Sequence, residues 1–127
     1  MFIINEEKLL IGHLELNRDN LIVVDKTKKY EFVVTLSYNW SDINKLKIGK
    51  KEKINFNEYI ISENNESALI WPSDSYVEKI NPNQIEFYFK FENFDDICFM
   101  NEKGQFEKNI EFLEIKVNIN CNDILME

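Results

Sequence analysis

Hydrophobic and polar residues alternate with a period of two along three stretches of the chain, residues 30–40, 85–92 and 113–120. Successive side chains of a β-strand point to opposite faces of its sheet, so this alternation predicts strands with one buried side and one solvent-facing side. A slip of one residue in the pairing would turn the whole apolar row to water, so the register of these strands is strongly specified. We therefore expect antiparallel sheets that each bury one face.

Weaker strand patterns fill much of the remaining chain. They occur at residues 9–16, 21–24, 54–61, 67–71 and 97–100. Gly12 interrupts the first of them, which predicts a β-bulge or a close backbone approach at that point. The first two patterns and residues 30–40 follow one another closely and predict a three-stranded meander. The last pattern and Phe106 flank a segment with Gly104, which predicts a hairpin turn.

Helical patterns are short and few. Ser41 can cap a helix over residues 41–46, and Gly49 would end it. A second short helix is expected over residues 122–126. Residues 73–81 lie between two prolines and are expected to form a surface loop. Many short strands with one or two short helices predict a mainly β (α+β) fold, in which two antiparallel sheets form a sandwich or a barrel-like structure.

The length of the chain and its charge limit the kinds of partner. Its 127 residues contain no linker or internal repeat, so we expect a single domain over residues 1–127. Fifteen basic residues stand against 23 acidic ones, a net charge of −8. That balance argues against nucleic acid or an anionic membrane surface as the partner, and it permits a basic partner protein. The sequence lacks a signal-peptide pattern and a membrane-spanning apolar stretch, so we expect a cytoplasmic protein.

The charge is unevenly distributed along the chain. Residues 86–127 hold ten acidic and four basic residues, whereas the first 85 residues are almost balanced. The last third is therefore expected to supply much of any surface that faces a basic partner. The one basic run comprises five lysines near Tyr38 and Trp40, namely Lys45, Lys47, Lys50, Lys51 and Lys53. Lysines beside aromatic residues can bind single-stranded nucleic acid, but the acidic remainder of the chain favours a solvated loop here.

Residues with catalytic potential are scarce. His13 is the single histidine and lies in an apolar run without a nucleophile motif. Cys98 and Cys121 lack the close pairing of a structural zinc site and are expected to be reduced thiols. The three glycines are too far apart to build a phosphate-binding loop. We therefore expect neither an enzyme nor a metal or cofactor site.

The order of several elements resembles a family of small acidic immunity proteins from bacterial contact-dependent growth inhibition and other polymorphic toxin systems. The resemblance covers roughly residues 32–101 and begins with a Leu-Ser-Tyr-Asn-Trp-Ser-Asp-Ile segment at residues 36–43. A Ser-Ala-Leu-Ile strand follows at residues 67–70, and an aromatic alternating strand at residues 85–92. The resemblance implies a protein that binds a cognate toxin domain and blocks its active site or substrate-binding surface. Many such toxins are nucleases, which are basic, so an acidic inhibitor would complement them.

Binding energy at such an interface concentrates in a few aromatic and charged residues. The candidates for partner contacts are Tyr38, Trp40, Asp42, Trp71, Asp74, Tyr76, Glu92, Asp95 and Asp96. Trp40 and Trp71 could equally be core residues. Two other functions stay open: a phage-encoded acidic inhibitor of a host nucleic-acid enzyme, and a small β-barrel that binds an apolar ligand in an aromatic interior.

Overall fold

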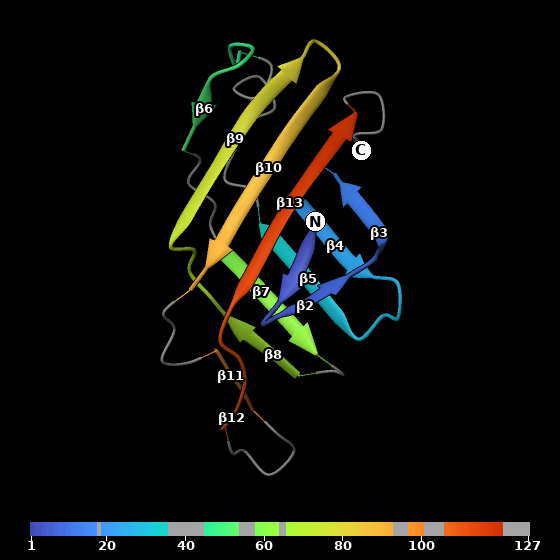
Figure 1. Cartoon of the computed structure of the whole chain (residues 1–127), viewed down its shortest axis with the longest axis vertical. Helices are drawn as coiled ribbons and strands as arrows, with labels where there is room; N and C mark the ends of the chain where they lie inside the picture. Colours follow the sequence, from blue (N-terminus) through green and yellow to red (C-terminus); the bar gives the residue numbers. More distant parts are fainter. Residues whose placement is uncertain are drawn as a thin grey trace.

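Two antiparallel β-sheets and a hairpin make up the part of the chain that the computed structural model describes, which is residues 1–17, 19–35, 45–53, 58–63, 66–92, 97–100 and 106–120 (Figure 1). The larger sheet has six strands in the order β2-β1-β13-β10-β9-β6. Their bounds are β1 Phe2–Ile4, β2 Glu7–Leu9, β6 Lys51–Glu52, β9 Asp74–Asn81, β10 Gln84–Phe91 and β13 Leu113–Asn120.

The second sheet has five strands in the order β3-β4-β5-β7-β8. They span β3 Ile11–Leu16, β4 Asn20–Asp25, β5 Tyr30–Thr35, β7 Glu58–Glu63 and β8 Glu66–Leu69. The predicted meander is confirmed, because β3, β4 and β5 are consecutive antiparallel neighbours. The remaining strands, β11 Ile97–Met100 and β12 Phe106–Ile110, form the predicted hairpin.

The two sheets pack face to face, and their strands run across one another (Figure 1). Aromatic rings fill the space between them. The ring of Phe32 on β5 lies 5.5 Å from that of Phe89 and 5.6 Å from that of Phe91, both on β10. Tyr59 on β7 contacts the same two rings, at 5.8 and 6.0 Å. The apolar rows of the alternating strands therefore meet in one core, as the sequence predicts.

The alternation of β10 and β13 sets which side chains face outward. Residues 85–91 of β10 pair with residues 113–119 of β13 without a break in register. Phe87, Phe89 and Phe91 are fully buried, so Glu86, Tyr88 and Lys90 between them lie on the opposite face of the sheet.

Residues 73–81 are not the loop that the sequence suggested, because residues 74–81 form strand β9. β9 pairs with β10 over most of its length, and its Val77 is completely buried. The two prolines lie outside the strand, Pro72 before it and Pro82 in the turn to β10. They bound the strand and remove none of its ladder hydrogen bonds.

None of the described residues is helical. Four residues of the predicted helix at 41–46 lie outside the described part, as does the whole of the one predicted at 122–126. Lys45 and Leu46 are described and are not helical, and Leu46 is buried against the core.

The bulge predicted at Gly12 is confirmed, because the β3–β4 register shifts between Ile11 and His13. A Cβ atom at Gly12 would lie 2.7 Å from the Cα atom of Lys26, which is closer than a real side chain can approach. The amide of Lys26 also donates a hydrogen bond of 2.7 Å to the carbonyl of Leu10. Glycine is therefore needed where β3 passes the end of β4.

Replacing Phe89 by alanine should lower the free energy of unfolding by about 3–5 kcal/mol, because it leaves a cavity between the sheets. Urea unfolding of the wild type and the Phe89→Ala variant measures the difference. Leu10→Ala is the matched control, since Leu10 is 69% exposed and its loss should cost less than about 0.5 kcal/mol. Equal destabilisation by the two changes would contradict the assignment of the core.

Candidate functional site

The outer face of the six-stranded sheet carries two stacked tyrosines. Tyr76 on β9 and Tyr88 on β10 are direct cross-strand partners. Their ring centres lie 5.0 Å apart and the ring planes differ by 26°. Charged side chains surround this pair on β9, β10 and β13. We call the set the tyrosine face; it comprises Asp74, Tyr76, Glu78, Glu86, Tyr88, Lys90, Glu114 and Lys116.

Both phenol groups donate hydrogen bonds to carboxylates of this face. The Tyr88 hydroxyl donates to Oε2 of Glu114 at 2.6 Å, and the Tyr76 hydroxyl donates to Oε1 of Glu86 at 3.1 Å. Lys116 places its Nζ atom 3.0 Å from the same oxygen of Glu86. Glu86 is almost fully buried, and this cation and phenol compensate part of its charge. The tyrosine face is therefore a network of hydrogen bonds and an ion pair that spans three strands.

The same contacts make both phenols poor acids. Burial raises the pKa of Tyr88 far above its ordinary value, and the hydrogen bond to Glu114 adds to the shift. Burial also raises the pKa of Tyr76, and the negative charges of Glu78 and Asp74 raise it further. Both tyrosines stay protonated at neutral pH, so they act as hydrogen-bond donors and aromatic surfaces and not as bases.

The basic run of the sequence lies along the edge of this sheet. Its strand β6 pairs with β9, with Lys51 opposite Glu78 and Glu52 opposite Val77. The Nζ atom of Lys51 lies 4.7 Å from the centre of the Tyr76 ring, which is a cation–π contact. Residues 51 and 52 of the run thus form a paired edge strand, whereas its composition favoured a solvated loop.

Four of the nine predicted contact residues belong to the described part of the chain. Asp74 and Tyr76 belong to the tyrosine face. Glu92 directly follows β10 and pairs with Lys90, at 3.5 Å between Oε2 and Nζ. Because Lys90 on β10 lies opposite Asp74 on β9, Asp74 and Glu92 lie at the same end of the sheet. The remaining five, Tyr38, Trp40, Asp42, Asp95 and Asp96, lie outside the described residues.

Trp71 is not a core residue. It follows β8 and has 70% of its surface exposed, and the nearby Leu69 is 55% exposed. The chain then joins β9, where the amide of Ser73 donates a hydrogen bond of 2.8 Å to the carbonyl of Lys90. Trp71 therefore lies close in sequence to the end of the sheet that holds Asp74 and Glu92.

Sequence reasoning missed Tyr88 and Lys51 as members of the site. The alternation of residues 85–91 placed Tyr88 on the wet face, but its stacking partner depends on the β9–β10 register. Residues 73–81 had been expected to form a loop, so no partner strand was assigned there. The contact of Lys51 with Tyr76 joins residues 25 positions apart, and no local pattern signals it.

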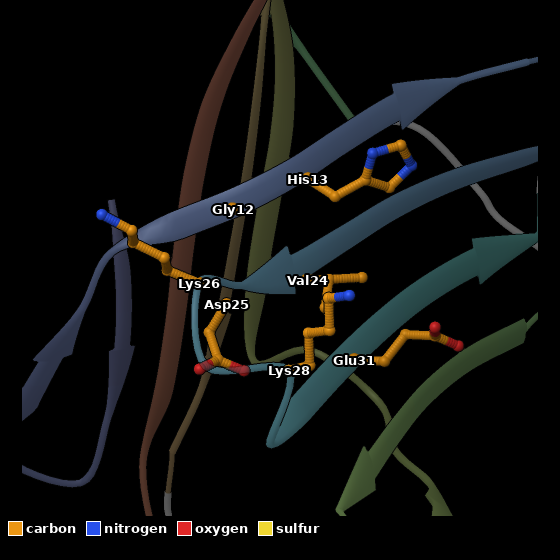
Figure 2. Close-up of a pocket in the computed structure, with 7 residues that line it drawn as sticks. All are labelled: Gly12, His13, Val24, Asp25, Lys26, Lys28 and Glu31. Carbon is orange, nitrogen blue, oxygen red and sulfur yellow. The ribbon is translucent and has the colours of Figure 1, made fainter.

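A second candidate is a hollow of about 440 Å³ on the five-stranded sheet (Figure 2). Its lining comprises Gly12, His13, Val24, Asp25, Lys26, Lys28 and Glu31. His13 and Glu31 both lie opposite Val24, one on each neighbouring strand. In Figure 2, His13 and Asp25 point in different directions, so they do not form an acid–base pair.

The carboxylate of Asp25 organises the turn between β4 and β5. It accepts hydrogen bonds from the amide of Thr27 at 3.0 Å, from the amide of Tyr30 at 2.7 Å, and from the Thr27 hydroxyl. Burial works to raise the pKa of Asp25, but the hydrogen bonds from Thr27 and Tyr30 outweigh it and lower the pKa below its ordinary value. Asp25 therefore has a structural role in the turn between β4 and β5.

Within the described ranges, no three histidine, cysteine or acidic side chains are grouped so that they could hold a metal ion. No helix in that part of the chain is long and apolar enough to cross a membrane. Comparisons with protein-family models, curated proteins and solved structures find no match to this chain.

Replacing Asp25 by asparagine should lower the free energy of unfolding at pH 7 by about 1–3 kcal/mol, because the turn amides lose a charged acceptor. The pKa of Asp25 is lower in the folded state than in the unfolded chain, where it is about 3.9. The stabilising contribution is therefore complete above about pH 4 and is lost as the pH falls through the folded-state pKa.

Urea unfolding at pH 7 and pH 3 measures this difference, with the exposed Asp19→Asn as the matched control. We expect Asp25→Asn to approach the wild type at pH 3, and Asp19→Asn to match it at both values. A deficit of Asp25→Asn that is unchanged at pH 3 would rule out the charge as its origin.

Proposed function

We propose that the protein is a cytoplasmic inhibitor of the immunity type, which binds a basic toxin domain and neutralises it by stoichiometric occlusion. It would not be an enzyme, and the toxin would most simply be a nuclease. The observation that carries the proposal is the tyrosine face, a hydrogen-bonded array of aromatic and carboxylate groups on a chain of net charge −8. Such an array suits recognition of cationic side chains better than it suits catalysis.

Electrostatics support a basic partner and refine the earlier expectation about the last third of the chain. Glu86 and Glu114 share the tyrosine face, but hydrogen bonds from tyrosines and the Lys116 ion pair partly compensate them. The exposed carboxylate of Asp74 and the net charge of the chain would therefore contribute more to steering the partner. Complementary charge of this kind raises the association rate more than it raises the affinity.

The aromatic residues supply the other half of an interface. Trp71 is strongly exposed and has an exposed leucine two residues before it. Tryptophan is among the residues most enriched at interface positions that dominate binding energy. We propose Trp71, Asp74, Tyr76 and Glu92 as contacts, with Tyr38, Trp40, Asp42, Asp95 and Asp96 as further candidates.

A phage-encoded inhibitor of a host nucleic-acid enzyme would use the same acidic surface, so the gene neighbourhood distinguishes it from an immunity protein. An apolar ligand inside a β-barrel is less well supported. Phe32, Phe89 and Phe91 are fully buried, and the Phe32 ring contacts the other two where such a ligand would lie.

Coexpression with the product of the adjacent open reading frame tests the proposal. We expect that product alone to arrest growth, and we expect this protein to restore growth and to copurify with it in a 1:1 complex. Growth arrest that continues in the presence of this protein, together with the absence of a complex, would overturn the proposed function.

Replacing Trp71 by alanine should weaken that complex at least tenfold, because an exposed aromatic anchor is lost at the interface. The free energy of unfolding should stay within about 0.5 kcal/mol of the wild type, since the side chain is largely exposed. Calorimetric titration and urea unfolding measure the two effects. Leu10→Ala, an equally exposed apolar truncation outside the proposed contacts, should leave the affinity unchanged; an equal loss in both variants would contradict the assignment.

A further inference from the structure

A basic segment of the chain lies against the edge of an acidic sheet. Five of the nine residues from Lys45 to Lys53 are lysines. Residues 51 and 52 of this segment form β6 and cover part of the free side of β9 (Figure 1). The pairing of β6 therefore shows that the edge of β9 accepts an extended segment with cationic side chains.

The contacts that hold the segment are few. In the described part of the chain, the pairing on this side of β9 is limited to residues 77–79. Lys51 and Glu52 pair with β9, and the amide of Gly49 donates a hydrogen bond of 2.9 Å to the carbonyl of Lys79. The side chain of Lys51 adds its contact with the Tyr76 ring. A two-residue strand whose single lysine is exposed is held far more weakly than the central strands of the sheet.

One end of the segment is fixed and the other is exposed. Leu46 is buried in the core and fastens the start of the segment. Gly49 has a φ of +80°, and no atom beyond those of Gly49 and its two chain neighbours lies within 4 Å of the position that a Cβ atom would take there. The backbone can therefore turn at Gly49 without a steric clash. Residues 50–53 beyond it are exposed or only partly buried. These four residues can therefore leave the edge of β9 while Leu46 stays in place.

We propose that the edge of β9, with Tyr76 and Glu78, is the docking site for an extended basic segment of the partner protein. Residues 50–53 occupy this site in the free protein and are displaced when the partner's strand adds to β9. The inference rests on the proposed function and names the surface and the kind of segment that it takes. The partner's cation replaces Lys51 on the Tyr76 ring, while its backbone replaces the pairing of β6.

The chemistry of the edge favours a protein strand over a nucleic acid. Glu78 lies opposite Lys51, and the exposed Asp74 lies further along β9 on the same face. These carboxylates repel phosphate and attract guanidinium or ammonium groups. Arginine stacks on aromatic rings better than the more strongly hydrated lysine does, so an arginine-bearing strand can compete with Lys51 for Tyr76.

The first test uses the peptide acetyl-Arg-Val-Arg-Val-Arg-amide as a probe and follows backbone amide shifts of the full chain by NMR. We expect shifts centred on residues 74–79, and binding at least threefold tighter in Lys51→Gln than in the wild type. Lys8→Gln is the matched control, because Lys8 is exposed on β2 at the opposite edge of the same sheet. Shifts located elsewhere, or equal effects of the two variants, would overturn the proposal.

The second test locks β6 in place with a disulfide, in a background in which both native cysteines are serine. Paired residues of antiparallel strands have Cα atoms about 4.5–5.5 Å apart, which suits a disulfide, so Lys51→Cys with Glu78→Cys can be oxidised. The reduced form lacks the Glu78 carboxylate and should bind the peptide more weakly than the wild type does. We expect oxidation of the same variant to abolish the binding that remains. An Ile3→Cys, Lys8→Cys pair locks β1 to β2 as the control and should bind equally in both forms.

The two proposals fail in different ways. A locked β6 protein that still binds the peptide or the toxin would overturn the displacement of residues 50–53 and leave the proposed function intact. A wild-type protein that binds the peptide at β9 but neither binds nor neutralises the adjacent gene product would support the docking site and contradict the inhibitor.

Discussion

The contact of Phe32 with Phe89 and Phe91 joins the two sheets, and the rest of the structure depends on it. These rings are fully buried, so β5 and β10 must present these faces to each other. Because strand side chains alternate, burying Phe87, Phe89 and Phe91 commits Glu86, Tyr88 and Lys90 to the opposite face. The core therefore determines the surface: the tyrosine face exists where it does because the phenylalanines behind it are buried.

The carboxylates of the tyrosine face are held by hydrogen bonds and an ion pair, which compensate their negative charge only in part. Tyr76, Tyr88 and Lys116 contact the carboxylates of Glu86 and Glu114, so these acids would already be ordered when the proposed partner binds. Ordered groups lose less conformational entropy on binding than mobile ones do. Lys51 sits on the outermost ring and belongs to a weakly paired segment. The centre of the face is thus its most highly connected part, and the β6 edge is its least connected part.

Prediction from the sequence succeeded where one face of a strand is entirely apolar. The alternation at residues 85–91 and 113–119 predicted two strands, and the structure confirms both. It adds that they pair with each other without a break in register. Prediction failed at β9, whose only fully buried residue is Val77 and whose flanking prolines suggested a loop. Trp71 shows the same limit. The sequence left open whether it is a core residue, because an isolated tryptophan does not reveal whether a neighbouring strand covers it, and the structure shows that it is exposed. Local patterns report burial well only when several residues carry the same signal.

By itself, the sequence determined the mainly β class with antiparallel sheets, the inward row of each strongly alternating strand and the net charge of −8. These properties are sums over many residues or follow from the two-residue period of a strand. Only the tertiary structure decided which strands are neighbours, and hence that Tyr76 stacks on Tyr88 and that Lys51 lies on Tyr76. Pairing is a long-range choice made by the packing of whole sheets, so contacts between residues far apart in the chain carry no local signal.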